Sequence, residues 1–103
     1  RGRHRVHPRW LQARLQSRQI HYWRDKQGHE VDFVVVKRGR LPIAVETKWS
    51  SRDFDPANLK IFLRQYPNAK ALVVANDIEK SFDKRIGSMN IRYMTLSDLM
   101  KFI

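Results

Sequence analysis

The sequence contains no cysteine, which excludes disulfide bonds and thiolate metal sites. It has no glycine-rich phosphate loop, so these 103 residues do not form an ATPase by themselves. No apolar run approaches the roughly 20 residues of a membrane-spanning helix, and no secretory signal pattern is present. We therefore expect a cytoplasmic location and no contact with a membrane.

Acidic residues are scarce relative to basic ones. Ten Asp and Glu stand against 21 Lys and Arg, which gives a formal net charge of +11. A domain this basic usually binds a polyanion, and nucleic acid is the commonest one. DNA is therefore the expected partner, with an incidentally basic surface as the alternative.

The amino-terminal end carries much of this charge. Residues 1–24 contain seven arginines and no acidic residue. We expect residues 1–7 to form a basic tail and residues 8–103 to form a single domain. The first residue is not methionine, which leaves open that the chain is a domain excised from a longer protein.

Hydrophobic periodicity predicts an α/β domain with the order α-β-β-β-α-β, followed by a further strand and a short helix. The strand expected over 71–75 is entirely apolar, so it should lie parallel to the strand over 41–49 after a right-handed crossover. The complete prediction has a helix over 8–17, strands over 19–24, 30–37 and 41–49, a helix that begins at Asp55-Pro56 and ends before Pro67, the strand over 71–75, a short helix over 79–86, an edge strand over 91–94, and a terminal turn capped by Ser97.

Two of these apolar strands carry charged residues in their centres. Asp32 lies on the first, and Glu46 and Lys48 lie on the second. A charged group inside a strand of valine and isoleucine needs an ionic partner, a metal or a chemical role. Because side chains alternate along a strand, Glu46 and Lys48 share a face, as do Glu30 and Asp32.

The length of the loop between these strands decides whether the charged residues meet. A three-residue loop, Arg38-Gly39-Arg40, places Asp32 opposite Glu46 and Glu30 opposite Lys48. Gly39 or a neighbour would then take a left-handed conformation. A four-residue loop would put Asp32 on the other face.

Two carboxylates that face each other repel unless a cation lies between them. We therefore expect Asp32 and Glu46 to bind Mg²⁺ or Mn²⁺, with Glu30 as an additional candidate ligand. Lys48 would position the attacking water or neutralise charge on a phosphate, as phosphodiester hydrolysis requires. The alternative is a structural ion network that joins Glu30 to Lys48 and Asp32 to a nearby arginine.

The spacing of these residues resembles a known family. An Asp on one strand and Glu-x-Lys on the next, here Asp32 and Glu46-Thr47-Lys48, is similar to the PD-(D/E)XK nuclease superfamily of restriction endonucleases and Holliday junction resolvases. More narrowly, Tyr22-Trp23-Arg24 and the run from Gly28 to Phe33 resemble the C-terminal nuclease-like domain of a prokaryotic AAA-type ATPase family.

The resemblance implies a restriction-endonuclease-like, three-layer α/β core with a mixed central sheet. It implies that Asp32, Glu46 and the Thr47 carbonyl hold the metal and that Lys48 serves the attacking water. It also implies an ATPase module in the full-length protein, and a homodimer is a further option. Residues 8–18 contain no acid, whereas active members often supply one from the first helix.

The function expected from the sequence is therefore a metal-dependent DNA endonuclease-like domain that hydrolyses phosphodiester bonds. The alternative is a catalytically weak or inactive domain of a larger ATPase that binds nucleic acid or another protein. The expected contacts to DNA phosphates are Arg24, Arg38, Arg40, Ser50, Arg52 and Lys60.

Overall fold

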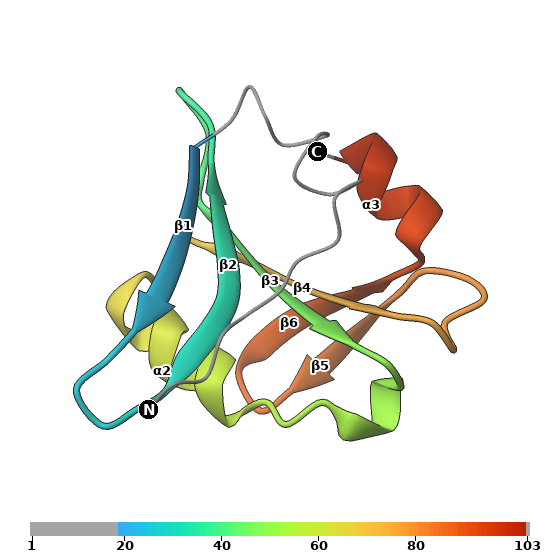
Figure 1. Cartoon of the computed structure of the whole chain (residues 1–103), viewed down its shortest axis with the longest axis horizontal. Helices are drawn as coiled ribbons and strands as arrows, with labels where there is room; N and C mark the ends of the chain where they lie inside the picture. The colour runs from blue at the N-terminus through green and yellow to red at the C-terminus, as the bar shows by residue number, and fades with distance from the viewer. Residues whose placement is uncertain (1–18, 103) are drawn as a thin grey trace.

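The structure is a computed structural model that describes residues 19–102. The tail expected over 1–7 and the helix expected over 8–17 lie outside the described residues. Six strands form one mixed sheet in the order β1-β2-β3-β4-β6-β5 (Figure 1), which confirms the predicted fold class. The elements are β1 (Gln19–Arg24), β2 (Glu30–Val36), β3 (Ile43–Lys48), the 3-10 helix η1 (Ser51–Asp53), α2 (Ala57–Gln65), β4 (Lys70–Ala75), β5 (Phe82–Ile86), β6 (Met89–Met94) and α3 (Leu96–Phe102).

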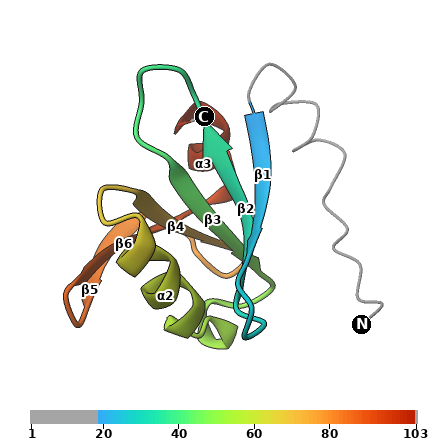
Figure 2. The same ribbon diagram turned by 90° about the vertical axis from the view of Figure 1, so that its left-hand side faces the viewer.

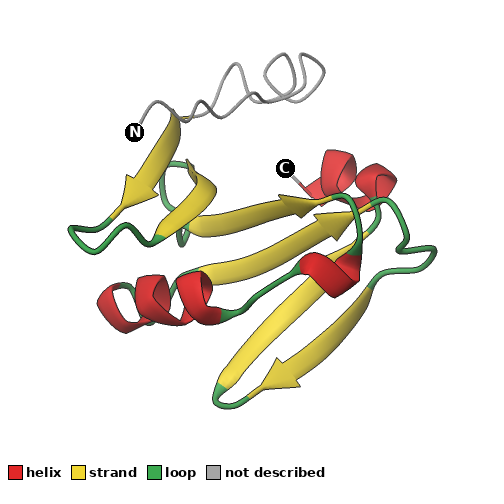
Figure 3. Cartoon of the chain, turned by 60° about the horizontal axis from the view of Figure 1, so that its bottom comes forward, coloured by secondary structure: helices red, strands yellow, loops and turns green. Residues whose placement is uncertain are grey.

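Apolar side chains form a separate core on each face of the sheet. Leu59 and Phe62 of α2 pack on one face against residues that include Val73. Leu99 of α3 packs on the other face against residues that include Phe33. Figure 3 shows the two helices on opposite sides of the strands, so the described part of the chain has three layers.

The crossover from β3 through α2 to β4 joins two parallel strands, as predicted. The two strands pair in parallel from Ile43–Lys70 to Lys48–Ala75. Helix α2 begins one residue later than expected, at Ala57, and the Asp55 carboxylate accepts a hydrogen bond of 2.9 Å from the Ala57 N–H. No helix of residues 19–102 is long and apolar enough to cross a membrane.

The helix predicted over 79–86 is wrong, because this region contains the strand β5. Phe82 and Ile86 are spaced as on one face of a helix, but β5 and β6 form an antiparallel hairpin that closes at the Ile86–Met89 pair. Gly87 has a φ of +60°, and a two-residue Gly-Ser loop is typical of a type II′ hairpin turn.

The last strand and helix also differ from the prediction. Strand β6 is not an edge strand, since it pairs in parallel with β4 and antiparallel with β5. The cap of α3 is Thr95 rather than Ser97. The Thr95 hydroxyl accepts a hydrogen bond of 3.0 Å from the Asp98 N–H, which satisfies a donor at the helix start.

The register of the β2–β3 hairpin is the one expected from the odd-length loop. The pairs are Phe33–Val45, Val34–Ala44 and Val35–Ile43. Gly39 has a φ of +75°, a left-handed conformation that glycine adopts without steric cost. The paired strands are shorter than predicted, because β2 ends at Val36 and β3 begins at Ile43.

Candidate functional site

Strands β2 and β3 lie together near their hairpin loop and part toward the other end (Figure 1). Their last antiparallel pair is Phe33–Val45, so Asp32 and Glu46 are the next residues along the two strands. The Asp32 carboxylate crosses the opening between the strands. Its Oδ2 accepts hydrogen bonds from the Thr47 N–H at 2.7 Å and from the Thr47 hydroxyl at 3.1 Å. A side chain thus replaces the main-chain pairing where the strands separate.

A β-bulge lies at the same point on the other side of β2. His21 pairs with Val34 and Trp23 pairs with Val31, so β2 has one residue more than β1 between these pairs. Val31 and Val34 consequently both pack in the core under α2, although they are three positions apart. A bulge redirects the side chains beside it and is common next to active sites. Asp32 lies inside this bulge.

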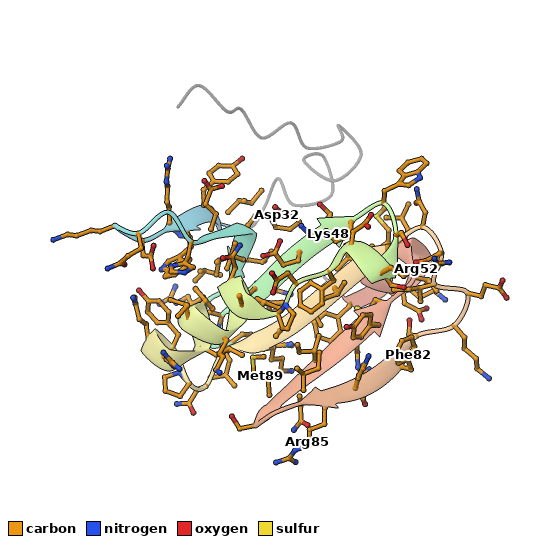
Figure 4. The ribbon with its side chains drawn as sticks, turned by 90° about the horizontal axis from the view of Figure 1, so that it is seen from below. Asp32, Lys48, Arg52, Phe82, Arg85 and Met89 are labelled. Carbon is orange, nitrogen blue, oxygen red and sulfur yellow. The ribbon has the colours of Figure 1, made fainter. Side chains whose placement is uncertain are left out.

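Glu46 and Lys48 point to the face of the sheet that α2 covers. Glu46 pairs with Val73 and Lys48 with Ala75, and both partners belong to the core on that face. Glu46 exposes only 3% of its surface and Asp32 only 8%. Lys48 is half-buried. Figure 4 labels Asp32 on β2 and Lys48 on the neighbouring strand β3. The three residues predicted to be catalytic therefore lie on adjacent strands, at the point where β2 and β3 part.

Glu30 occupies a different position from the one expected. The β2–β3 ladder does not extend to Glu30 and Lys48. Glu30 pairs with Arg24 of β1, and its carboxylate lies 3.6 Å from the Arg24 guanidinium. The bulge interrupts the side-chain alternation of β2 between Val31 and Val34. Arg24, an expected phosphate contact, is thus joined to an acid in this structure.

Asp77, which was not among the predicted site residues, holds the loop after β3. The Asp77 carboxylate accepts hydrogen bonds from the Ser50 hydroxyl at 3.1 Å and from the Ser51 hydroxyl and N–H, both at 2.9 Å. The N–H of Ser51 and the two hydroxyls hold the pKa of Asp77 below its usual range. Ser50, predicted to contact DNA, also caps η1 by accepting from the Arg52 N–H. The sequence did carry a signal for this contact. Because β3 and β4 are parallel, their carboxyl ends lie at one edge of the sheet, and the serines after β3 therefore meet Asp77 after β4.

The remaining expected phosphate contacts fall into two groups. Arg52 and Lys60 are exposed on η1 and α2, which follow the end of β3 that carries Lys48. Arg38 and Arg40 are exposed in the β2–β3 loop, at the opposite end of the two strands. The structure therefore places these predicted phosphate contacts at opposite ends of the β2–β3 hairpin.

A pocket of about 670 Å³ lies between the β1–β2 turn and α2. Its lining residues include Arg24, Lys26 and Gln65. Asp25, also in the lining, accepts hydrogen bonds from the His29 N–H at 2.8 Å and contacts its ring Nδ1 at 2.7 Å. Although desolvation acts in the opposite direction, these hydrogen bonds with His29 lower the pKa of Asp25.

The donor set at the parting strands consists of oxygen atoms, which suits a hard divalent cation. Mg²⁺ is commonly held by one or two carboxylates together with waters and substrate phosphate. Asp32 and Glu46 provide two buried carboxylates on neighbouring strands. Among residues 19–102, no group of three or more His, Asp or Glu gathers at one point. The site therefore fits an ion that keeps several water ligands, and it does not fit an all-protein cage.

These features define an α/β protein with a mixed sheet between two helices and a pair of buried carboxylates where two strands part. The chain belongs to the family described as "Domain of unknown function (DUF4143)", whose model matches residues 9–96. No curated protein matches the chain.

A solved structure shares the fold. It is a chain from an assembly of McrB AAA+ hexamers with bound McrC from Thermococcus gammatolerans. The TM-score is 0.60 at 14% sequence identity, and the match covers 84% of this chain. This chain spans only 25% of the matched chain, so it corresponds to one part of a larger protein.

Proposed function

We propose that this chain is a metal-dependent DNA endonuclease-like domain that hydrolyses phosphodiester bonds. The observation that carries the proposal is the placement of Asp32, Glu46 and Lys48 on two neighbouring strands that part at this point. This arrangement of two acids and a lysine agrees with the PD-(D/E)XK resemblance of the sequence. Asp32 and Glu46 are the proposed ligands for Mg²⁺ or Mn²⁺.

The bound ion would stabilise negative charge on the scissile phosphate and lower the pKa of a water molecule. Lys48 comes from the same face of β3 as Glu46, two residues further along the strand. Its ammonium group would orient the water or neutralise charge on the phosphate. Thr47 holds Asp32 in place through its N–H and hydroxyl, so Thr47 acts as a positioning residue.

Surface residues near the end of β3 are suited to hold nucleic acid. Trp49 follows Lys48 directly and exposes 81% of its surface, which suits stacking against a base. Arg52 and Lys60 are exposed cations on the next two helices and are proposed to contact phosphates. The net charge of +11 supports the same kind of partner.

The likeness to a chain in an AAA+ assembly supports a place for this domain beside an ATPase module. In that arrangement the module would supply nucleotide hydrolysis, which this chain cannot supply without a phosphate loop. The matched chain is four times as long as the matched region, which leaves room for further domains in that protein.

The test is a nicking assay with supercoiled plasmid in Mg²⁺, in Mn²⁺ and in EDTA. We expect cutting with either ion and no cutting in EDTA. Asp32→Ala and Lys48→Ala should abolish cutting. The matched controls, Asp83→Ala and Lys80→Ala, change the same residue types at exposed positions and should retain it. Cleavage in EDTA, or full activity in both site variants, would overturn the proposal.

The second candidate is a binding domain that keeps the fold without catalysis. The observation that favours it is that no group of three or more His, Asp or Glu side chains gathers at one point among residues 19–102. Such a domain would bind DNA without metal, and its affinity would fall with salt as counterions are displaced. If no DNA binding occurs even at low salt, the data would instead favour a protein-interaction role beside an ATPase.

A further inference from the structure

A second basic site lies away from the parting strands, at the β2–β3 loop. A pocket of about 290 Å³ is lined there by Lys37, Gly39, Arg40, Leu41, Ile43, Lys70 and Phe102. The lining comes from the hairpin loop, from the start of β4 and from the end of α3. Figure 2 shows this loop and α3 at the same end of the molecule.

Local contacts hold the Lys70 ammonium group and the main chain around this pocket. The Lys70 Nζ lies 5.5 Å from the centre of the Phe102 ring, a cation–π arrangement. The Lys70 N–H donates a hydrogen bond of 2.8 Å to the Pro42 carbonyl, which ties β4 to the hairpin. The Arg40 N–H donates to the Lys37 carbonyl at 3.0 Å, which shapes the turn.

The charge of this pocket is of one sign. Three of its lining side chains are cations, namely Lys37, Arg40 and Lys70, and no acid lines it among the described residues. A pocket lined by cations attracts an anion such as a phosphate group. Gly39 has no neighbouring atom within 4 Å of the place where a Cβ would lie, so a ligand can approach the main chain there.

The pocket combines these cations with an apolar wall. Leu41 exposes 48% of its surface, and Phe102 and Ile43 complete this wall. A volume of about 290 Å³ suits a phosphate with its attached sugar better than a large ligand. We propose that this pocket binds a phosphate group carried by nucleic acid or by a free nucleotide, with Arg40 and Lys70 as its principal contacts.

This site is distinct from the candidate catalytic residues. Lys70 pairs with Ile43, which belongs to the core under α3, whereas Glu46 pairs with Val73, which belongs to the core under α2. The two positions are three residues apart along β3, or about 10 Å, and they face opposite sides of the sheet. The inference goes beyond the proposed endonuclease function and does not depend on Asp32 or Glu46.

The test measures binding in EDTA, so that metal-dependent cleavage cannot contribute. Fluorescence anisotropy with labelled duplex and single-stranded oligonucleotides would compare the native chain with Arg40→Gln/Lys70→Gln across a range of salt concentrations. Each lost phosphate contact lowers the log–log salt slope on duplex DNA by about 0.9. We therefore expect weaker binding and a slope smaller by about 1.8 for the two contacts together.

The matched control is Lys80→Gln/Arg85→Gln, which removes the same charge from exposed positions outside the pocket. Circular dichroism would verify that both double variants remain folded. ATP is the second probe. If the native chain binds ATP and only Arg40→Gln/Lys70→Gln loses this binding, the ligand is a free nucleotide. If that variant loses affinity for oligonucleotides alone, the phosphate belongs to nucleic acid. Equal behaviour of the two double variants with every probe would overturn the proposal, as would the absence of binding by the native chain.

Discussion

The Thr47 N–H donates a hydrogen bond of 2.7 Å to the Asp32 carboxylate across the opening between β2 and β3. The middle residue of Glu46-Thr47-Lys48 therefore positions the acid on the neighbouring strand, while the residues on either side of it face α2. One short segment of β3 thus orients an acid of β2 and presents two charged side chains of its own.

The Thr47 hydroxyl adds a second hydrogen bond to Asp32, at 3.1 Å. Thr47→Val removes this donor and keeps both the shape of the side chain and the main-chain donor. We expect a loss of about 1 kcal/mol in the free energy of unfolding, measured by urea denaturation. Cleavage should fall by up to about tenfold, since a positioning contact is lost. Thr47→Ser retains the hydroxyl and should remain closer to the native protein in both measurements.

Metal binding at Asp32 and Glu46 should stabilise the folded chain. At an ion concentration about 100 times the dissociation constant, linkage gives about 2.7 kcal/mol, seen as a rise in Tm with Mn²⁺. Asp32→Asn and Glu46→Gln should remove most of this rise. The control Asp83→Asn, at an exposed acid, should retain it. A Tm that responds to Mn²⁺ equally in all four proteins would place the ion elsewhere.

The α2 side of the core should depend strongly on Leu59, which is fully buried. Leu59→Ala leaves a cavity beneath the helix, and we expect a loss of about 2–5 kcal/mol in urea denaturation. Leu63, four residues along the same helix, is only half-buried, so Leu63→Ala should cost less. Equal losses would mean that α2 packs differently from the arrangement described above.

Asp77 should make folding stability depend on pH. Hydrogen bonds from Ser51 and Ser50 lower its pKa in the folded state, so its contribution is present above the unfolded value of about 3.8 and is lost as pH falls below it. Asp77→Ala should lower Tm by a few degrees near neutral pH, and the difference from the native chain should shrink in acid. Glu79→Ala, an exposed acid nearby in the chain, provides the comparison.

The sequence predicted the central strands well because their apolar runs are long and clearly bounded. The hairpin register followed from loop length, which gave the observed pairs Phe33–Val45, Val34–Ala44 and Val35–Ile43. The position of Glu30 did not follow, because neither the bulge in β2 nor the parting of β2 from β3 leaves a mark in local periodicity. Both are properties of the pairing between strands, which local periodicity does not report.

The carboxyl-terminal part was harder to predict for a different reason. Phe82 and Ile86 are four residues apart, which fits one face of a helix as well as one face of a strand. The Gly87-Ser88 pair was the better guide, since a two-residue loop with glycine first is typical of a hairpin. With β5 unrecognised, β6 was placed at the edge of the sheet instead of inside it.

Strand β5 is the outermost strand beside β6, and Phe82, Asp83, Lys84 and Arg85 on it are exposed. The Arg92 Nε–H of β6 donates a hydrogen bond of 2.8 Å to the Asp83 carboxylate. Lys84 and Arg85 are the other charged residues on this edge strand. Two copies joined through β5 would bring these positive charges together, and charged edge strands resist such growth. The charges on β5 therefore disfavour pairing of two copies along this edge of the sheet.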